Sequence, residues 1–342
     1  MTAARGPAVV LPGEDGSRPG MVDPWLADPV AAATVTEVDA VVGRDVAAWW
    51  RDPATAPDPV AAHLEVVVTG VAGYRSLTAR GLHPVAVAGH GVGEFAALVA
   101  AGALQLDQVV ELVHWRAELL CLAPRPSCAG LAAVLGPGAE AVARAAVAQV
   151  DGDTHGDTHA NGDTHGDGDT HGDGDGHGRL CVAAVDAPQR TVLAGGRTEL
   201  ARAAEVVHAA GLELVRLPGR APCHGPLMAS VAAHLATALA DLDWSAPLVP
   251  VVPNADGEAT RDPGRLRAAL RRHLTAPVLW EATSRSLADA GATSVVEIGA
   301  VPVLGPLVAQ VHPHLPVSLA SGPGAPVPTD VPGPALAGSV PT

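Results

Sequence analysis

The chain has 342 residues, of which 48% are apolar and 2% aromatic, so it is long enough to bury a large core made mainly of aliphatic side chains. Its formal charge of -15 excludes a protein that binds nucleic acid through a basic surface. No stretch of about 18 uninterrupted apolar residues and no signal-peptide pattern is present, so neither a membrane span nor secretion is expected.

The four cysteines give no sign of an oxidising compartment. Cys121, Cys128, Cys181 and Cys223 show no C-x-x-C spacing, and the chain is not a short disulfide-rich scaffold. We therefore expect reduced thiols and a cytoplasmic protein.

Short apolar strands alternate with Ala-rich helices, which is typical of an α/β fold with a parallel sheet. A strand is predicted at 8–11, where it ends in a Pro-Gly loop, and another at 85–88, before a helix at 94–101. Between that second strand and its helix lies the turn Gly89-His90-Gly91-Val92-Gly93. In a G-x-S-x-G nucleophile elbow, a serine occupies the centre of such a turn. Here the central residue is Gly91.

Residues 129–204 predict a small subdomain. After a predicted helix at 106–122, a strand is expected at 130–136, a helix at 139–150, strands at 180–185 and 191–193, and a helix at 199–210. That order is typical of a split, ferredoxin-like α/β unit. We expect the main sheet to resume at Leu214-Val215 and to continue through 249–252 and 294–298.

An imperfect GDTH repeat occupies residues 151–178 of the small subdomain. Its five histidines and eight aspartates are possible metal ligands at high local density. However, the repeat resembles neither an EF-hand loop nor a calcium-binding nonapeptide. We therefore interpret it as a solvated low-complexity insertion and predict no metal site.

These patterns divide the chain into three parts. A large α/β-hydrolase-like subdomain with a parallel-sheet core is predicted to comprise residues 1–128 and 205–320, with the small ferredoxin-like subdomain inserted as 129–204. Residues 321–342 are rich in Pro, Gly and Ala and lack periodicity, so they predict a disordered tail.

The segment Gly89 to Glu94 resembles the GHSxGE signature of the acyltransferases that load malonyl or related units onto acyl carrier proteins in fatty-acid and polyketide synthesis. Other segments of the chain resemble further motifs of that family, and they occur in the same order as in the family. These segments are 11–21, 114–117, 130–134, 221–228, 274–280 and 296–299. The segment 274–280 resembles a helix of the family. The resemblance spans residues 8 to 320 without the repeat. It implies a monomer, an acyl carrier protein or polyketide synthase component as partner, and acyl-CoA as substrate or ligand with no cofactor.

The resemblance also assigns roles to individual residues. His224 falls at the catalytic base, and Arg116 falls at the arginine that pairs with the extender carboxylate. The backbone amides of Glu14 and Val92 fall at the oxyanion hole. Asn254 falls near the segment that orients the histidine. His90 is expected to shape the pocket and form hydrogen bonds.

Position 91 departs from the family pattern. Glycine has no side chain to acylate, and loss of such a nucleophile costs about a million-fold in turnover, so transfer through a covalent intermediate is expected to fail. Glu14 and Asp15 replace a Gln-Gly pair, and their charges would oppose negative charge in the oxyanion hole and a malonyl carboxylate. Cys223 is a conceivable substitute nucleophile, but adjacent residues of an extended segment point to opposite sides, away from His224.

Three hypotheses follow. In the first, the chain is an acyltransferase homologue that has lost transfer and binds acyl-CoA, a carrier protein or another synthase component. In the second, His224 activates a water molecule near Gly91, and the protein hydrolyses or decarboxylates an acyl thioester. In the third, Gly91 was engineered into an otherwise active transferase, although the altered Glu14-Asp15 loop argues against a single designed change.

Overall fold

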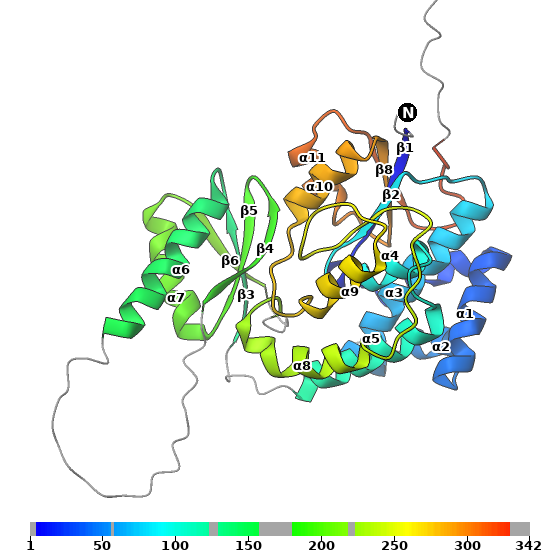
Figure 1. Ribbon diagram of the computed structural model, residues 1–342, viewed down its shortest axis with the longest axis horizontal. Helices are drawn as coiled ribbons and strands as arrows, with labels where there is room; N and C mark the ends of the chain where they lie inside the picture. Colours follow the sequence, from blue (N-terminus) through cyan, green and yellow to red (C-terminus); the bar gives the residue numbers. More distant parts are fainter. Residues whose placement is uncertain (1–4, 56–57, 123–128, 157–179, 218–222, 329–342) are drawn as a thin grey trace, which may run out of the picture.

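The computed structural model describes residues 5–55, 58–122, 129–156, 180–217 and 223–328, and it has two lobes (Figure 1). The strands are β1 (Gly6–Leu11), β2 (Ala86–Gly89), β3 (Gly130–Leu135), β4 (Cys181–Ala187), β5 (Arg190–Gly195), β6 (Glu213–Leu217), β7 (Val251–Val252), β8 (Ala292–Ile298) and β9 (Val317–Ala320). The α-helices are α1 (Pro29–Val42), α2 (Val46–Arg51), α3 (Pro59–Ala79), α4 (Gly93–Ala100), α5 (Leu106–Leu122), α6 (Ala139–Gly156), α7 (Arg197–Ala209), α8 (Ala229–Ala238), α9 (Pro263–Arg271), α10 (Trp280–Asp289) and α11 (Gly305–Val311).

The large lobe is built on a parallel five-stranded sheet in the order β7-β2-β1-β8-β9. Every residue of β1 is buried, because both faces of the sheet are covered. Val9 and Leu11 pack in the core that contains α1, α3, α4 and α5. Ala8 and Val10 pack in a second core with α10, α11 and strands of the small lobe. The predicted α/β fold with a parallel-sheet core is confirmed.

The small lobe is an antiparallel sheet in the order β4-β5-β3-β6, with α6 and α7 together on one side of it (Figure 1). Five elements were predicted here, and β6 is the sixth, completing the β-α-β-β-α-β order of a ferredoxin-like unit. The prediction that Leu214-Val215 resumes the main sheet is wrong, since both residues pair with β3. The small sheet therefore extends to Leu217, beyond the predicted boundary at residue 204.

Two further segments differ from the sequence predictions. Residues 274–279 form turns and an isolated bridge between Val278 and Ala184 instead of a helix, and α10 begins only at Trp280. The first part of the segment predicted as a disordered tail packs against the large lobe. Ala325 and Val327 contact the core of that lobe, and Arg80 donates a hydrogen bond to the carbonyl of Ala325. Residues 329–342 lie outside the described residues.

The GDTH repeat is described only at its start. Helix α6 continues to Gly156, six residues into the predicted insertion, so these residues are helical and not irregular. Residues 157–178 lie outside the described part of the chain. Within the described residues, no helix is both long enough and apolar enough to cross a membrane.

A buried carboxylate on α3 holds the loop that follows β1. Glu65 is 3% exposed. Burial raises its pKa to about 7, although hydrogen bonds from the backbone of residues 20–22 lower the pKa in part. The folded-state pKa thus lies above the ordinary value of 4.5. The stability that protonated Glu65 contributes is therefore fully present below about pH 4.5 and is lost as the pH rises through about 7.

We therefore expect Glu65→Gln to become more stable relative to the native chain as the pH rises from about 5 to about 8, by up to about 3 kcal/mol. Glutamine removes the titration and keeps an oxygen for the loop amides. Urea unfolding at several pH values measures the difference, with Glu37→Gln on the exposed face of α1 as the control. A stability difference that stays constant across this pH range would contradict the assignment.

Candidate active site

The turn between β2 and α4 has the geometry of a nucleophile elbow. Gly91 lies at its centre with φ +53, a left-handed conformation that glycine adopts without steric cost. The amide of Gly93 donates to the carbonyl of His90 at 2.9 Å, and the amide of Glu94 donates to that of Gly91 at 3.0 Å. A Cβ on Gly93 would lie 2.2 Å from the carbonyl oxygen of Leu11, so glycine allows the turn to lie directly on the end of β1.

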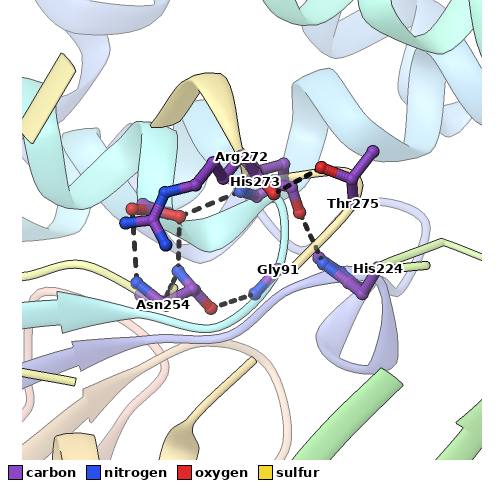
Figure 2. Close-up of polar contacts among 8 residues, drawn as sticks. Gly91, His224, Asn254, Arg272, His273 and Thr275 are labelled. Carbon is purple, nitrogen blue, oxygen red and sulfur yellow. Dashed lines mark hydrogen bonds and ion pairs between the residues drawn. The ribbon is translucent and has the colours of Figure 1, made fainter. Parts of the chain in front are cut away.

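A side chain at position 91 would point at a histidine. A Cβ built on Gly91 would lie 3.8 Å from Nε2 of His224, and it would meet no other described atom within 4 Å beyond its chain neighbours. Figure 2 shows Gly91 between His224 and Asn254. The predicted pairing of position 91 with His224 is thus present in space, although 133 residues separate them.

His224 is held as a neutral base. Its Nδ1 lies 2.7 Å from the backbone carbonyl of His273, and a carbonyl only accepts, so the ring proton is on Nδ1 and the lone pair is on Nε2. Burial lowers the pKa of His224 well below its ordinary value, and electrostatic interactions with His273, Arg116 and His90 lower it further. Among described non-glycine residues, only His224 has a positive φ, +66. Such backbone strain persists where the surroundings fix a functional side chain.

Asn254 does not have the role that we predicted. Its Oδ1 accepts from the amide of Gly91 at 3.0 Å, and its Nδ2 donates to the carbonyl of Gly89 at 2.8 Å and to Glu94 at 2.6 Å. Asn254 follows β7, which pairs with β2. Its side chain therefore forms hydrogen bonds to the elbow on the side opposite His224 (Figure 2). The carbonyl of His273 orients His224 instead.

Behind the elbow, Glu94 joins Asn254 to His273. Oε2 of Glu94 lies 2.9 Å from Nδ1 of His273, and both side chains are buried. Burial raises the pKa of Glu94 to about 7, although Asn254 lowers it in part, and burial lowers the pKa of His273. Burial thus disfavours charge on either group, and the two side chains are joined by a buried hydrogen bond. In Figure 2, Asn254 contacts Gly91 and the backbone carbonyl of His273 contacts His224.

Arg116 lies where a carboxylate clamp was predicted, in the wall of the same pocket. It is 1% exposed on α5, and its NH1 lies 3.4 Å from Nδ1 of His63 on α3. The other ring nitrogen of His63 contacts the carboxylate of Glu14. The sequence prediction treated the charge of Glu14 as facing the oxyanion hole, whereas in the structure this carboxylate is paired with His63.

His90 connects the two lobes. Its Nε2 lies 2.9 Å from Asp186 on β4, and the second oxygen of Asp186 accepts from Nε of Arg190 on β5 at 2.9 Å. Burial alone would raise the pKa of Asp186, but the hydrogen bond from His90 and the charges of His90 and Arg190 lower it overall. An ionised Asp186 thus holds the elbow of the large lobe against the small sheet.

These groups surround one pocket between the lobes. The cavity has a volume of about 60 Å³, several times what a single water molecule needs. The backbone nitrogen of Val92 lies 3.5 Å from the Cβ position of Gly13, which brings the Val92 amide beside the Gly13-Glu14 loop. The predicted site residues that line the pocket are Glu14, His90, Gly91, Val92, Arg116 and His224, together with Cys223. Asn254 lies behind the elbow.

Sequence reasoning missed His63, His273, Asp186 and Arg190. His63 and Glu65 are the polar residues in the otherwise apolar first half of α3. His273 directly precedes the 274–280 motif, so both histidines left a weak signal in the sequence. Asp186 and Arg190 left none. The described residues contain no group of three or more His, Cys, Asp or Glu that could hold a metal ion.

The proteins that are similar to this chain in sequence include malonyl CoA-acyl carrier protein transacylases and a polyketide biosynthesis protein. The chain is 29% identical over 323 residues to a malonyl CoA-acyl carrier protein transacylase of Salmonella typhimurium, covering 93% of this chain and 96% of that protein. It is 30% identical over 232 residues to the polyketide biosynthesis protein ThaF of Burkholderia thailandensis, covering 68% of this chain but 18% of ThaF. No family model matches the chain.

Solved structures agree. An acyl carrier protein S-malonyltransferase from Vibrio cholerae matches with a TM-score of 0.80 and 27% identity, covering 93% of this chain and 97% of that chain. A malonyl-transacylase solved in complex with its type II polyketide acyl carrier protein matches with a TM-score of 0.80 and 25% identity, covering 93% and 96%.

Proposed function

Since this chain is homologous to the malonyl-CoA:acyl carrier protein transacylases and shares their fold, we propose that it binds a malonyl-type thioester without forming an acyl-enzyme. The homology places it with proteins of fatty-acid or polyketide biosynthesis. The proposed ligands are acyl-CoA and the acyl group carried by an acyl carrier protein. The malonyl-transacylase solved with its carrier protein supports the second.

The observation that supports this proposal most strongly is that a base and binding groups surround position 91, whereas Gly91 itself has no side chain to act as the nucleophile. Position 91 faces Nε2 of a neutral, anchored His224, while Arg116 and Val92 line the same pocket. Glu14 also lines this pocket, which supports the proposal that the groups assigned to binding and to stabilising an oxyanion lie together. Glycine supplies no oxygen or sulfur to attack a thioester, so the step that forms an acyl-enzyme has no nucleophile at this position.

Calorimetric titration with malonyl-CoA tests the proposal. We expect saturable binding to the native chain, and we expect Arg116→Gln to weaken it about tenfold or more, since hydrogen bonds to charged groups contribute about 1.5 to 3 kcal/mol. Transfer of malonyl from CoA to a holo-acyl carrier protein should stay at the background rate. Absence of binding, or transfer well above background, would overturn the proposal.

Hydrolysis is a second candidate function, favoured by the space between Gly91 and His224. Nε2 can accept a proton from a water molecule at the position that a nucleophile would occupy, and the water oxygen can attack the thioester carbonyl. The C–S bond then breaks, giving malonate and free CoA. Decarboxylation would instead break a C–C bond and give carbon dioxide and acetyl-CoA, so the products separate the two reactions.

For this candidate, we expect slow release of CoA from malonyl-CoA, reduced about 10² to 10⁴-fold in His224→Gln. Because the pKa of His224 lies well below 6.5 and the neutral ring is the base, the rate should be constant across neutral pH and fall only in acid. Chromatography of the products measures it, with Glu118→Gln on the exposed face of α5 as the control. Equal rates in the native chain and His224→Gln would rule out this route.

A further inference from the structure

Three elements of the large lobe bring Glu14, His63 and Arg116 into one chain of contacts. The carboxylate of Glu14, in the loop after β1, contacts Nε2 of His63 on α3. Nδ1 of the same ring lies 3.4 Å from NH1 of Arg116 on α5. Glu14 and Arg116 both line the pocket, whereas His63 is buried between them.

The two ends of this chain fix the proton on His63. A guanidinium only donates, so Nδ1 must accept from Arg116, and a carboxylate only accepts, so Nε2 must donate to Glu14. A neutral ring with its proton on Nε2 satisfies both contacts. A doubly protonated ring would direct an N–H at the guanidinium. The imidazole therefore links the anion to the cation without adding a charge of its own.

Arg116 is a buried cation that needs an anion. A guanidinium that is 1% exposed is costly to bury unless a negative charge compensates it. The carboxylates that line the pocket are Glu14, Asp15 and Asp186. Asp186 is already bound by His90 and Arg190. Glu14 is the carboxylate that reaches Arg116 through a single ring.

We propose that Glu14, acting through His63, is the internal counter-ion of Arg116 and shifts the preference of the pocket from carboxylated toward uncharged acyl thioesters. This inference rests on the proposed function, because it concerns the acyl group bound at the same site. Arg116 lines the pocket, and its Nε donates no hydrogen bond within the described residues, so the guanidinium has donor capacity left for a ligand carboxylate. Such a carboxylate places a second anion near Glu14, and the two compete for one cation.

The test is a ratio of dissociation constants. Calorimetric titration of malonyl-CoA and of acetyl-CoA with the native chain gives the preference for a carboxylate, since the two ligands share everything else. We expect Glu14→Gln to tighten malonyl-CoA binding about tenfold or more relative to acetyl-CoA, because it removes the competing charge. The amide oxygen of glutamine still accepts from His63, which keeps the fold of the loop.

Two further variants separate this role from a structural one. His63→Gln should keep the native ratio, because an amide can donate to Glu14 and accept from Arg116. Glu118→Gln removes an exposed carboxylate from the helix that carries Arg116 and should also keep it. If both ligands bind Glu14→Gln with the native ratio, the counter-ion role is overturned and the proposed function stands. If neither ligand binds any of these proteins, both fail.

Discussion

Replacing Gly91 with serine should convert the chain into a transferase that works through an acyl-enzyme. The new side chain would point at Nε2 of His224, which lies 3.8 Å from the Cβ position and is neutral, so the base and the nucleophile would be correctly paired. Removing such a nucleophile costs about a million-fold in turnover, and restoring it should recover much of that factor. The left-handed φ of +53 would cost a serine about 1 to 2 kcal/mol of stability.

The rate of malonyl transfer from CoA to a holo-acyl carrier protein measures this gain. The control is His224→Gln combined with Gly91→Ser, which should return the rate to that of the native chain, since nucleophile and base act as a unit. A folded serine variant that transfers no faster than the native chain would show that the pocket has lost more than its nucleophile.

Replacing Asn254 with alanine should have the largest effect on stability, about 3 to 5 kcal/mol in total, since each buried group left without a hydrogen bond costs about 1 to 3 kcal/mol. The side chain of Asn254 accepts from Gly91 and donates to Gly89 and Glu94, all in the buried part of the elbow. Its loss leaves buried donors and acceptors without partners and removes the hydrogen bond that helps keep the pKa of Glu94 near 7.

Urea unfolding of Asn254→Ala, Glu94→Gln and the double variant measures this network as a double-mutant cycle. We expect a coupling of about 1 to 3 kcal/mol, because the two side chains share a direct hydrogen bond. Strictly additive losses, or a loss for Asn254→Ala no larger than that of an exposed substitution, would contradict the role of Asn254 in fastening the elbow.

Much of the large lobe was predictable because its strands are short apolar runs that end at glycine. Strands β1 and β2 are buried on both faces, and the turn from Gly89 to Gly93 follows β2 directly, so local pattern and tertiary position agree. The fold class was recognisable from the order of motifs along the chain. Strand β6 was identified as a strand but assigned to the wrong sheet, since its pairing with β3 is not encoded in its own half-exposed residues.

The site was only partly predictable, because its polar contacts join distant residues. His224 and Arg116 were identified by their motifs, but the anchor of His224 is a backbone carbonyl 49 residues further along the chain, which no side-chain pattern marks. Likewise, the charge of Glu14 was visible in the sequence, while its pairing with His63 depends on how α3 packs beside the loop.

Incubation of the native chain with malonyl-CoA, followed by intact-protein mass spectrometry, tests the central claim most directly. We expect an unmodified mass under conditions in which Gly91→Ser acquires one malonyl group. A malonyl adduct on the native chain, located at Cys223 or at any other residue by peptide mapping, would contradict the claim that this chain forms no acyl-enzyme.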